Sequence, residues 1–138
     1  MAEKLGRREA QSVVDCMLDE AERRGFAFAV AVVDPAGNLI AFGRTGDDCV
    51  PLFVRMAQMK AYTAATWGQD TKWLRENVVG RENIPMTWFG NPPLTAILGG
   101  VVLRDSKGRV LGAIGESGPP EQIDEELARI GEAHFKSL

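Results

Sequence analysis

The sequence has few of the side chains that build metal or redox centres. It contains two cysteines, Cys16 and Cys49, and a single histidine, His134. These residues do not stand in the spacing of a metal-ligand motif, so no metal site is expected. Isolated cysteines without a disulfide framework are typical of a reducing compartment, and the sequence therefore predicts a cytoplasmic protein.

The sequence also lacks an excess of positive charge and a long apolar run. Sixteen Lys and Arg residues stand against nineteen Asp and Glu residues, and the net charge is −3. This balance argues against nucleic acid as a partner, because nucleic-acid binding needs a clustered basic surface. No segment approaches the roughly 20 apolar residues of a membrane helix, so no membrane partner is expected. The 138 residues, 45% of them hydrophobic, predict one domain over 1–138.

Two β-hairpins are predicted from apolar runs that flank turn-forming residues. Residues 99–118 contain two β-branched runs separated by Asp105-Ser106-Lys107-Gly108, which supplies a turn start and a glycine for positive φ. Residues 26–33 and 39–42 form the second pair. The run 26–33 is apolar at every position, which predicts a central strand covered on both faces. Glycines 112, 115 and 118 predict close approach of a packed helix or of a ligand.

Helices are predicted over 4–24, from a cap at Asp47 or Asp48 to about Trp67, from Asp70, and from about Pro120 onward, where the acidic run 124–126 is expected to form a solvated helix start. In the second helix the apolar positions form a stripe that includes Lys60. This lysine either pairs with a strand carboxylate or extends along the stripe edge, or it faces a pocket as a desolvated ammonium. Residues 80–93 are expected to form a loop, and Trp88 and Phe89 within it are candidates for a pocket wall or lid.

Glu116 is the one carboxylate in the apolar end of the last strand. Strand alternation places it on the side of Ile114. If that side faces the helix of Lys60, the two groups form either a structural salt bridge or an acid/base pair. Thr63 lies one helical turn from Lys60 and is a candidate donor to the same ligand. Asp34 and Arg44, which close the two strands of the first hairpin, are further ligand-binding candidates, although Asp34 before a proline more commonly forms a turn.

Four segments together resemble the GlcG/HbpS family. They are AVAVVDPAGNLIAFGR (29–44), QMKAYTAATWG (58–68), LGGVVLRDSKGRVLGAIGESG (98–118) and PEQIDEELARIGEA (120–133). The same domain resembles the C-terminal part of PduO-type corrinoid adenosyltransferases. The resemblance implies an α/β, profilin-like fold with a five-stranded, mainly antiparallel sheet flanked by helices. It also implies a homo-oligomer whose default ligand and cofactor is haem or a related tetrapyrrole.

The residues leave two ligand-based functions open, beside a purely structural or regulatory role that would need no ligand-sized cavity. For haem binding, the available axial donors are His134, Tyr62, Met56, Met59 and Met86. The alternative is a catabolic lyase, isomerase or hydrolase that acts on a small carboxylated or aromatic compound. In that mechanism Glu116 is the acid/base and Lys60 anchors the substrate. Glu116 and the bulky segment ENIPMTWFGNPP (82–93), which both depart from the family pattern, favour this second function.

Overall fold

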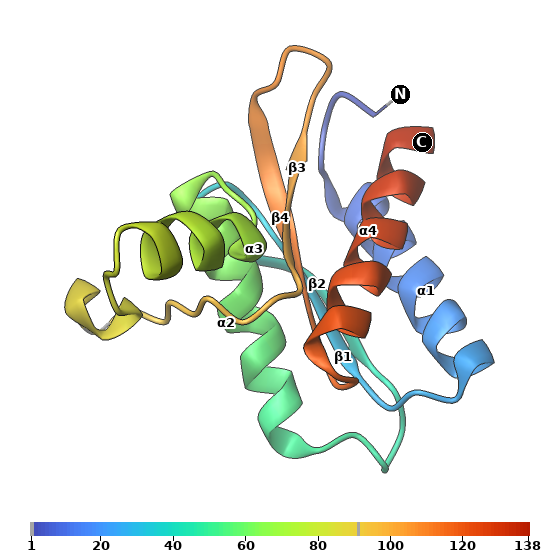
Figure 1. Ribbon diagram of the computed structural model, residues 1–138. Coiled ribbons are helices and arrows are strands. Elements are labelled where there is room, and N and C mark those ends of the chain that lie inside the picture. Colours follow the sequence, from blue (N-terminus) through green and yellow to red (C-terminus); the bar gives the residue numbers. More distant parts are fainter. Residues whose placement is uncertain (1, 91) are drawn as a thin grey trace.

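The computed structural model describes residues 2–90 and 92–138, and Figure 1 shows the arrangement of its helices and strands. The four main helices are α1 (Arg7–Arg24), α2 (Pro51–Trp67), α3 (Thr71–Leu74) and α4 (Glu121–Ser137). The strands are β1 (Ala29–Val33), β2 (Leu39–Arg44), β3 (Gly100–Arg104) and β4 (Val110–Ser117). A π-helical segment (Arg75–Arg81) and a short 3-10 helix (Met86–Phe89) follow α3. The chain is therefore an α/β protein with both predicted hairpins.

The sheet is antiparallel throughout and has the strand order β2-β1-β4-β3. All five residues of β1 are buried, which confirms the central strand predicted from its continuous apolar run. Helices α1 and α4 lie side by side on one face, and α2 lies on the other (Figure 1). Alternate side chains of each strand therefore enter two separate cores, one against α1 and α4 and one against α2.

The expectation of five strands is wrong for the described residues, in which the sheet has four. The segment Leu94–Leu98 leads into β3, but its backbone groups bond to side chains of the helices. The amide of Thr95 donates to the hydroxyl of Thr63 at 2.9 Å, and the carbonyl of Ala96 accepts from Arg75 Nε at 2.9 Å. Backbone groups bonded in this way are not available to a neighbouring strand. Asn91, in the predicted loop 80–93, lies outside the described residues.

Gly115 explains how closely α2 lies on the sheet. A Cβ atom added at Gly115 would stand 1.9 Å from the carbonyl oxygen of Ala57 in α2. The backbones of β4 and α2 are therefore in direct contact, and the close approach predicted at this glycine is made by a helix. Among the helices of residues 2–90 and 92–138, none is both long enough and apolar enough to cross a membrane.

Candidate functional site

Three ionisable side chains meet in the protein interior where α2, β4 and α4 come together. The ammonium of Lys60 donates to Asp124 Oδ2 at 3.0 Å and to the backbone carbonyl of Glu116 at 2.8 Å. Only 1% of the surface of Lys60 is exposed, and Glu116 and Asp124 are 0% and 3% exposed. Water therefore does not screen these charges, and each must be balanced by a neighbour.

The charges of this cluster balance only if one of its two carboxyl groups is protonated. No N–H or hydroxyl group of the described residues donates to either carboxyl oxygen of Glu116 or to Oδ1 of Asp124, so the donor that these oxygens need is a proton held between the two carboxyl groups themselves. Burial raises the pKa of Glu116 to about 11, and the adjacent Asp124 carboxylate acts in the same direction. Burial also raises the pKa of Asp124, but the hydrogen bond with Glu116 and the charge of Lys60 oppose this rise. At neutral pH Glu116 is thus a neutral acid that donates to the Asp124 carboxylate, and Lys60 neutralises Asp124.

The structure confirms that Lys60 is buried but corrects how it is paired. Glu116 shares the side of β4 with Ile114, which packs against α1 and α4, and so it faces away from α2. Lys60 reaches across at Gly99, where an added Cβ would lie 3.1 Å from the ammonium nitrogen. Its ion-pair partner is Asp124, which the sequence pattern placed in the solvated start of the last helix. That placement is wrong because the inward face of α4 begins with Asp124 and continues through Leu127.

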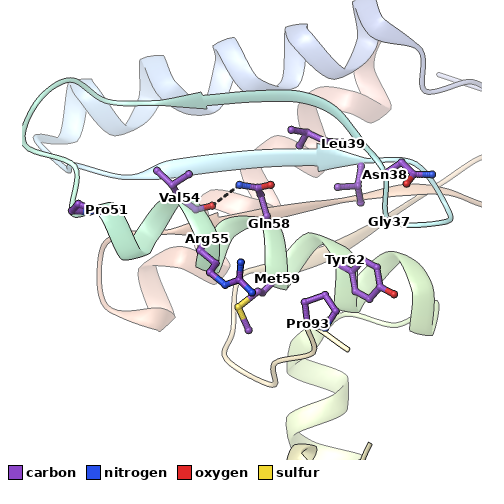
Figure 2. A pocket seen from close by; sticks show the side chains of 11 residues that line it. Gly37, Asn38, Leu39, Pro51, Val54, Arg55, Gln58, Met59, Tyr62 and Pro93 are labelled. Atoms are coloured by element: carbon purple, nitrogen blue, oxygen red, sulfur yellow. Dashed lines mark hydrogen bonds between the residues drawn. The ribbon is translucent and has the colours of Figure 1, made fainter. Parts of the chain in front are cut away.

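A separate hollow of about 460 Å³ lies between the β1–β2 hairpin and α2 (Figure 2). We call it the hairpin pocket. Helix α2 contributes two neighbouring rows of side chains, and the hairpin and the segment before β3 complete the wall. Its lining residues are Pro51, Val54, Arg55, Gln58, Met59 and Tyr62 of α2, Val33, Gly37, Asn38 and Leu39 of the hairpin, and Pro93.

The hairpin turn fits against α2 only because residue 37 is glycine. Asp34 Oδ1 accepts from the amides of Ala36 and Asn38, both at 2.9 Å, and this holds the turn. Gly37 has φ +85°, and a Cβ added there would lie 2.4 Å from the ring of Tyr62. The turn is thus seated on the Tyr62 ring, which forms one end of the pocket.

The charge of the pocket lining is positive. The lining contains one cation, Arg55, and several hydrogen-bond donors, but no carboxylate. Arg55, Met59 and Tyr62 follow one another at helical spacing and project from the same side of α2 (Figure 2). Gln58 Nε2 donates to the carbonyl of Val54 at 3.2 Å. Arg55 has no ion-pair partner among residues 2–90 and 92–138. The arrangement suits an apolar ligand with an anionic group.

Three of the predicted ligand-binding residues take part in local structure. The Thr63 hydroxyl donates to the carbonyl of Met59 at 2.8 Å and accepts from the amide of Thr95. Asp34 holds the hairpin turn. Arg44 donates to the carbonyls of residues 45 and 46 and borders a shallow depression beside the hairpin pocket. Their ligand-binding roles stay predictions.

The two aromatic residues predicted as a lid lie on the 3-10 helix, outside the pocket lining. Trp88 is 73% exposed, and the ring of Phe89 packs edge-on against Trp67 with centroids 5.0 Å apart. Their ligand-binding role also stays a prediction. His134 lies elsewhere, in a groove between α1 and α4, where its Nε2 is 2.8 Å from the hydroxyl of Ser12.

Sequence reasoning missed Arg55, Gln58 and Asn38 as lining residues. Met59 and Tyr62, in contrast, were already candidates as iron donors. The signal was present on α2, because Arg55, Met59 and Tyr62 repeat at i, i+4 and i+7 on a side of the helix away from its alanine stripe.

Comparisons with known proteins agree on one family. A family model described as "Haem degrading protein HbpS-like" matches residues 5–133. Protein GlcG of Escherichia coli K12 is 34% identical over 113 residues, covering 82% of this chain and 81% of GlcG. A double mutant of Streptomyces reticuli HbpS is 30% identical, with a TM-score of 0.82, and the match covers 96% of this chain and 88% of HbpS.

A solved PduOC:haem complex has the same fold, with a TM-score of 0.84 at 21% identity, over 95% of this chain and 94% of PduOC. At this identity the likeness shows the fold alone. The family model and the GlcG match cover most of the chain, and they agree with the motifs in the hairpins and helices. The chain therefore belongs to the GlcG/HbpS family.

Proposed function

We propose that this protein binds haem or a related tetrapyrrole in the hairpin pocket. The observation that carries the proposal is the presence of two iron-donor side chains, Met59 and Tyr62, in one pocket with largely apolar walls. Methionine sulfur and tyrosine oxygen are both known axial ligands of haem iron. The family description and the haem-bound PduOC structure support the same ligand class.

The lining residues fit such a ligand. The volume of about 460 Å³ falls within the usual range of small-molecule sites, about 300–1,000 Å³. Val33, Leu39 and Val54 offer apolar contacts to a macrocycle, and Tyr62 is held in place by the hairpin turn at Gly37. Haem, when bound, supplies a redox-active iron. The chain's own contribution is to hold the ring, to provide an iron ligand from α2 and to exclude water from the apolar side.

A hemin titration of the purified protein tests this proposal. We expect a shifted Soret band, and we expect Tyr62→Phe or Met59→Leu to alter its position and weaken binding about tenfold, the equivalent of roughly 1.4 kcal/mol. His134→Gln is the matched control, because His134 is a donor of comparable strength in a different groove. An unshifted band, or a band that depends on His134 and on neither pocket donor, refutes binding at this site.

The catabolic enzyme is the weaker candidate. Glu116 has the kind of shifted pKa that is common in catalytic acids, but Glu116 and Lys60 are 0% and 1% exposed and do not line the hairpin pocket, so a substrate reaches them only if the packing of α4 opens. In this mechanism the neutral Glu116 carboxyl donates a proton to a carbonyl or enol oxygen of a small carboxylated or aromatic substrate, and Lys60 anchors the substrate carboxylate. Glu116→Gln should then abolish turnover of the substrate, and Lys60→Met should raise its KM. Unchanged turnover in Glu116→Gln would exclude the mechanism.

From the family resemblance we further propose a profilin-like arrangement, a homo-oligomer and a cytoplasmic location for this protein. Light scattering coupled to gel filtration tests the oligomer directly. A monomeric mass at micromolar concentration would contradict it.

A further inference from the structure

Arg55 is a cation for which the described part of the chain supplies no counter-ion. The protein carries nineteen acidic side chains and a net charge of −3. None of these acids is among the eleven residues that line the hairpin pocket. The pocket thus has a local charge opposite to that of the whole molecule.

The polar groups around Arg55 are also mostly suited to an anion. Tyr62 offers a hydroxyl, and Asn38 and Gln58 offer amides. Helix α2 begins at Pro51, which also lines the pocket. The positive end of the helix dipole therefore lies near Arg55, about one helical turn away. The guanidinium, as a planar fork of donors, matches the two oxygens of a carboxylate.

The apolar part of the wall indicates which kind of molecule the anionic group belongs to. Val54 and Met59 flank Arg55 on α2, and the Tyr62 ring lies beyond them (Figure 2). A ligand that places its anionic group on Arg55 would therefore lay an apolar, planar body along Met59 and Tyr62. An inorganic anion would leave this apolar surface uncovered.

We propose that the hairpin pocket selects planar apolar ligands that carry a carboxylate and that Arg55 is the residue that binds this carboxylate. The inference rests on the proposed function in that both use the same pocket. It extends that function by assigning the ligand class and its recognising residue. It does not require an iron ligand, and it applies equally to a porphyrin side chain and to a small aromatic acid.

Two small probes of equal shape separate charge from size. 2-Naphthoate and its neutral amide, 2-naphthamide, differ only in the group that would meet Arg55. By isothermal titration calorimetry we expect the acid to bind at least about tenfold more tightly than the amide. In Arg55→Gln the two affinities should agree within about twofold, and Arg55→Lys should recover part of the preference for the acid. Arg81→Gln, in the exposed end of the π-helical segment, is the matched charge control and should behave like the unaltered protein.

The outcomes distinguish this inference from haem binding. If hemin binds but the acid shows no advantage over the amide, or if Arg55→Gln keeps that advantage, the carboxylate assignment is wrong and haem binding stands. If naphthoate binds through Arg55 and hemin produces no shifted Soret band, the haem proposal is wrong and the carboxylate assignment stands. If neither probe nor hemin binds, both are wrong. Arg55 is exposed and unpaired in the described chain, so its substitution should leave the fold intact, which circular dichroism checks.

Discussion

Replacing Glu116 with glutamine should change the pH dependence of stability more than any other single substitution in the buried cluster. The pKa of Glu116 is about 11 in the folded protein, against an ordinary value of 4.5. Between these values the folded chain holds one proton more than the unfolded chain. Stability therefore falls as pH rises, by about 1.4 kcal/mol per pH unit for one proton.

The glutamine variant removes this dependence while keeping the contact. Its side-chain amide cannot titrate, and it can donate to Asp124 as the neutral acid does. Between pH 6 and pH 8 the unaltered protein should lose about 2.7 kcal/mol from this group, and the variant should lose none of it. At pH 7 the variant should be more stable by up to about 3 kcal/mol. In the unaltered protein, ionisation of Glu116 in water stabilises the unfolded state, and glutamine removes this contribution.

Urea unfolding at pH 6, 7 and 8 measures these differences, with the free energy of unfolding taken from linear extrapolation at constant m-value. Glu126→Gln is the matched control, because Glu126 lies on the exposed side of α4 and pairs with Arg24. Parallel pH profiles for the Glu116 variant and the unaltered protein would refute the reasoning, since Glu116 would then be ionised in the folded state.

Two further substitutions test the cluster and the pocket separately. Asp124→Asn leaves the Lys60 ammonium buried without its counter-ion, and it should cost about 3–5 kcal/mol in chemical unfolding; a loss below 1 kcal/mol would show that the pair contributes little. Gly37→Ala introduces a Cβ at φ +85°, 2.4 Å from the Tyr62 ring, and should lower stability by more than about 1 kcal/mol while displacing Tyr62 and weakening hemin binding. An unchanged Soret titration for Gly37→Ala would contradict the assigned position of that ring in the site.

Local patterns along the chain were sufficient to predict most of the secondary structure. Turn residues between apolar runs predicted both hairpins, and the continuous apolar run of β1 predicted its central place. Helical spacing predicted that Lys60 lies on the inward face of α2. Each of these features depends on residues within a few turns or strand positions of one another, so the sequence carries them directly.

The partners of these faces depend on the tertiary structure. Helical spacing could not show that Lys60 passes Gly99 to reach Asp124, because that contact joins positions 64 residues apart on opposite faces of the sheet. Strand alternation placed Glu116 with Ile114, but only the packing of α4 on that face determined that a second carboxyl group lies beside it. The hairpin pocket likewise exists because Gly37 lets the turn approach Tyr62. Periodicity determines which way a side chain points, whereas the packing of the layers determines what it meets.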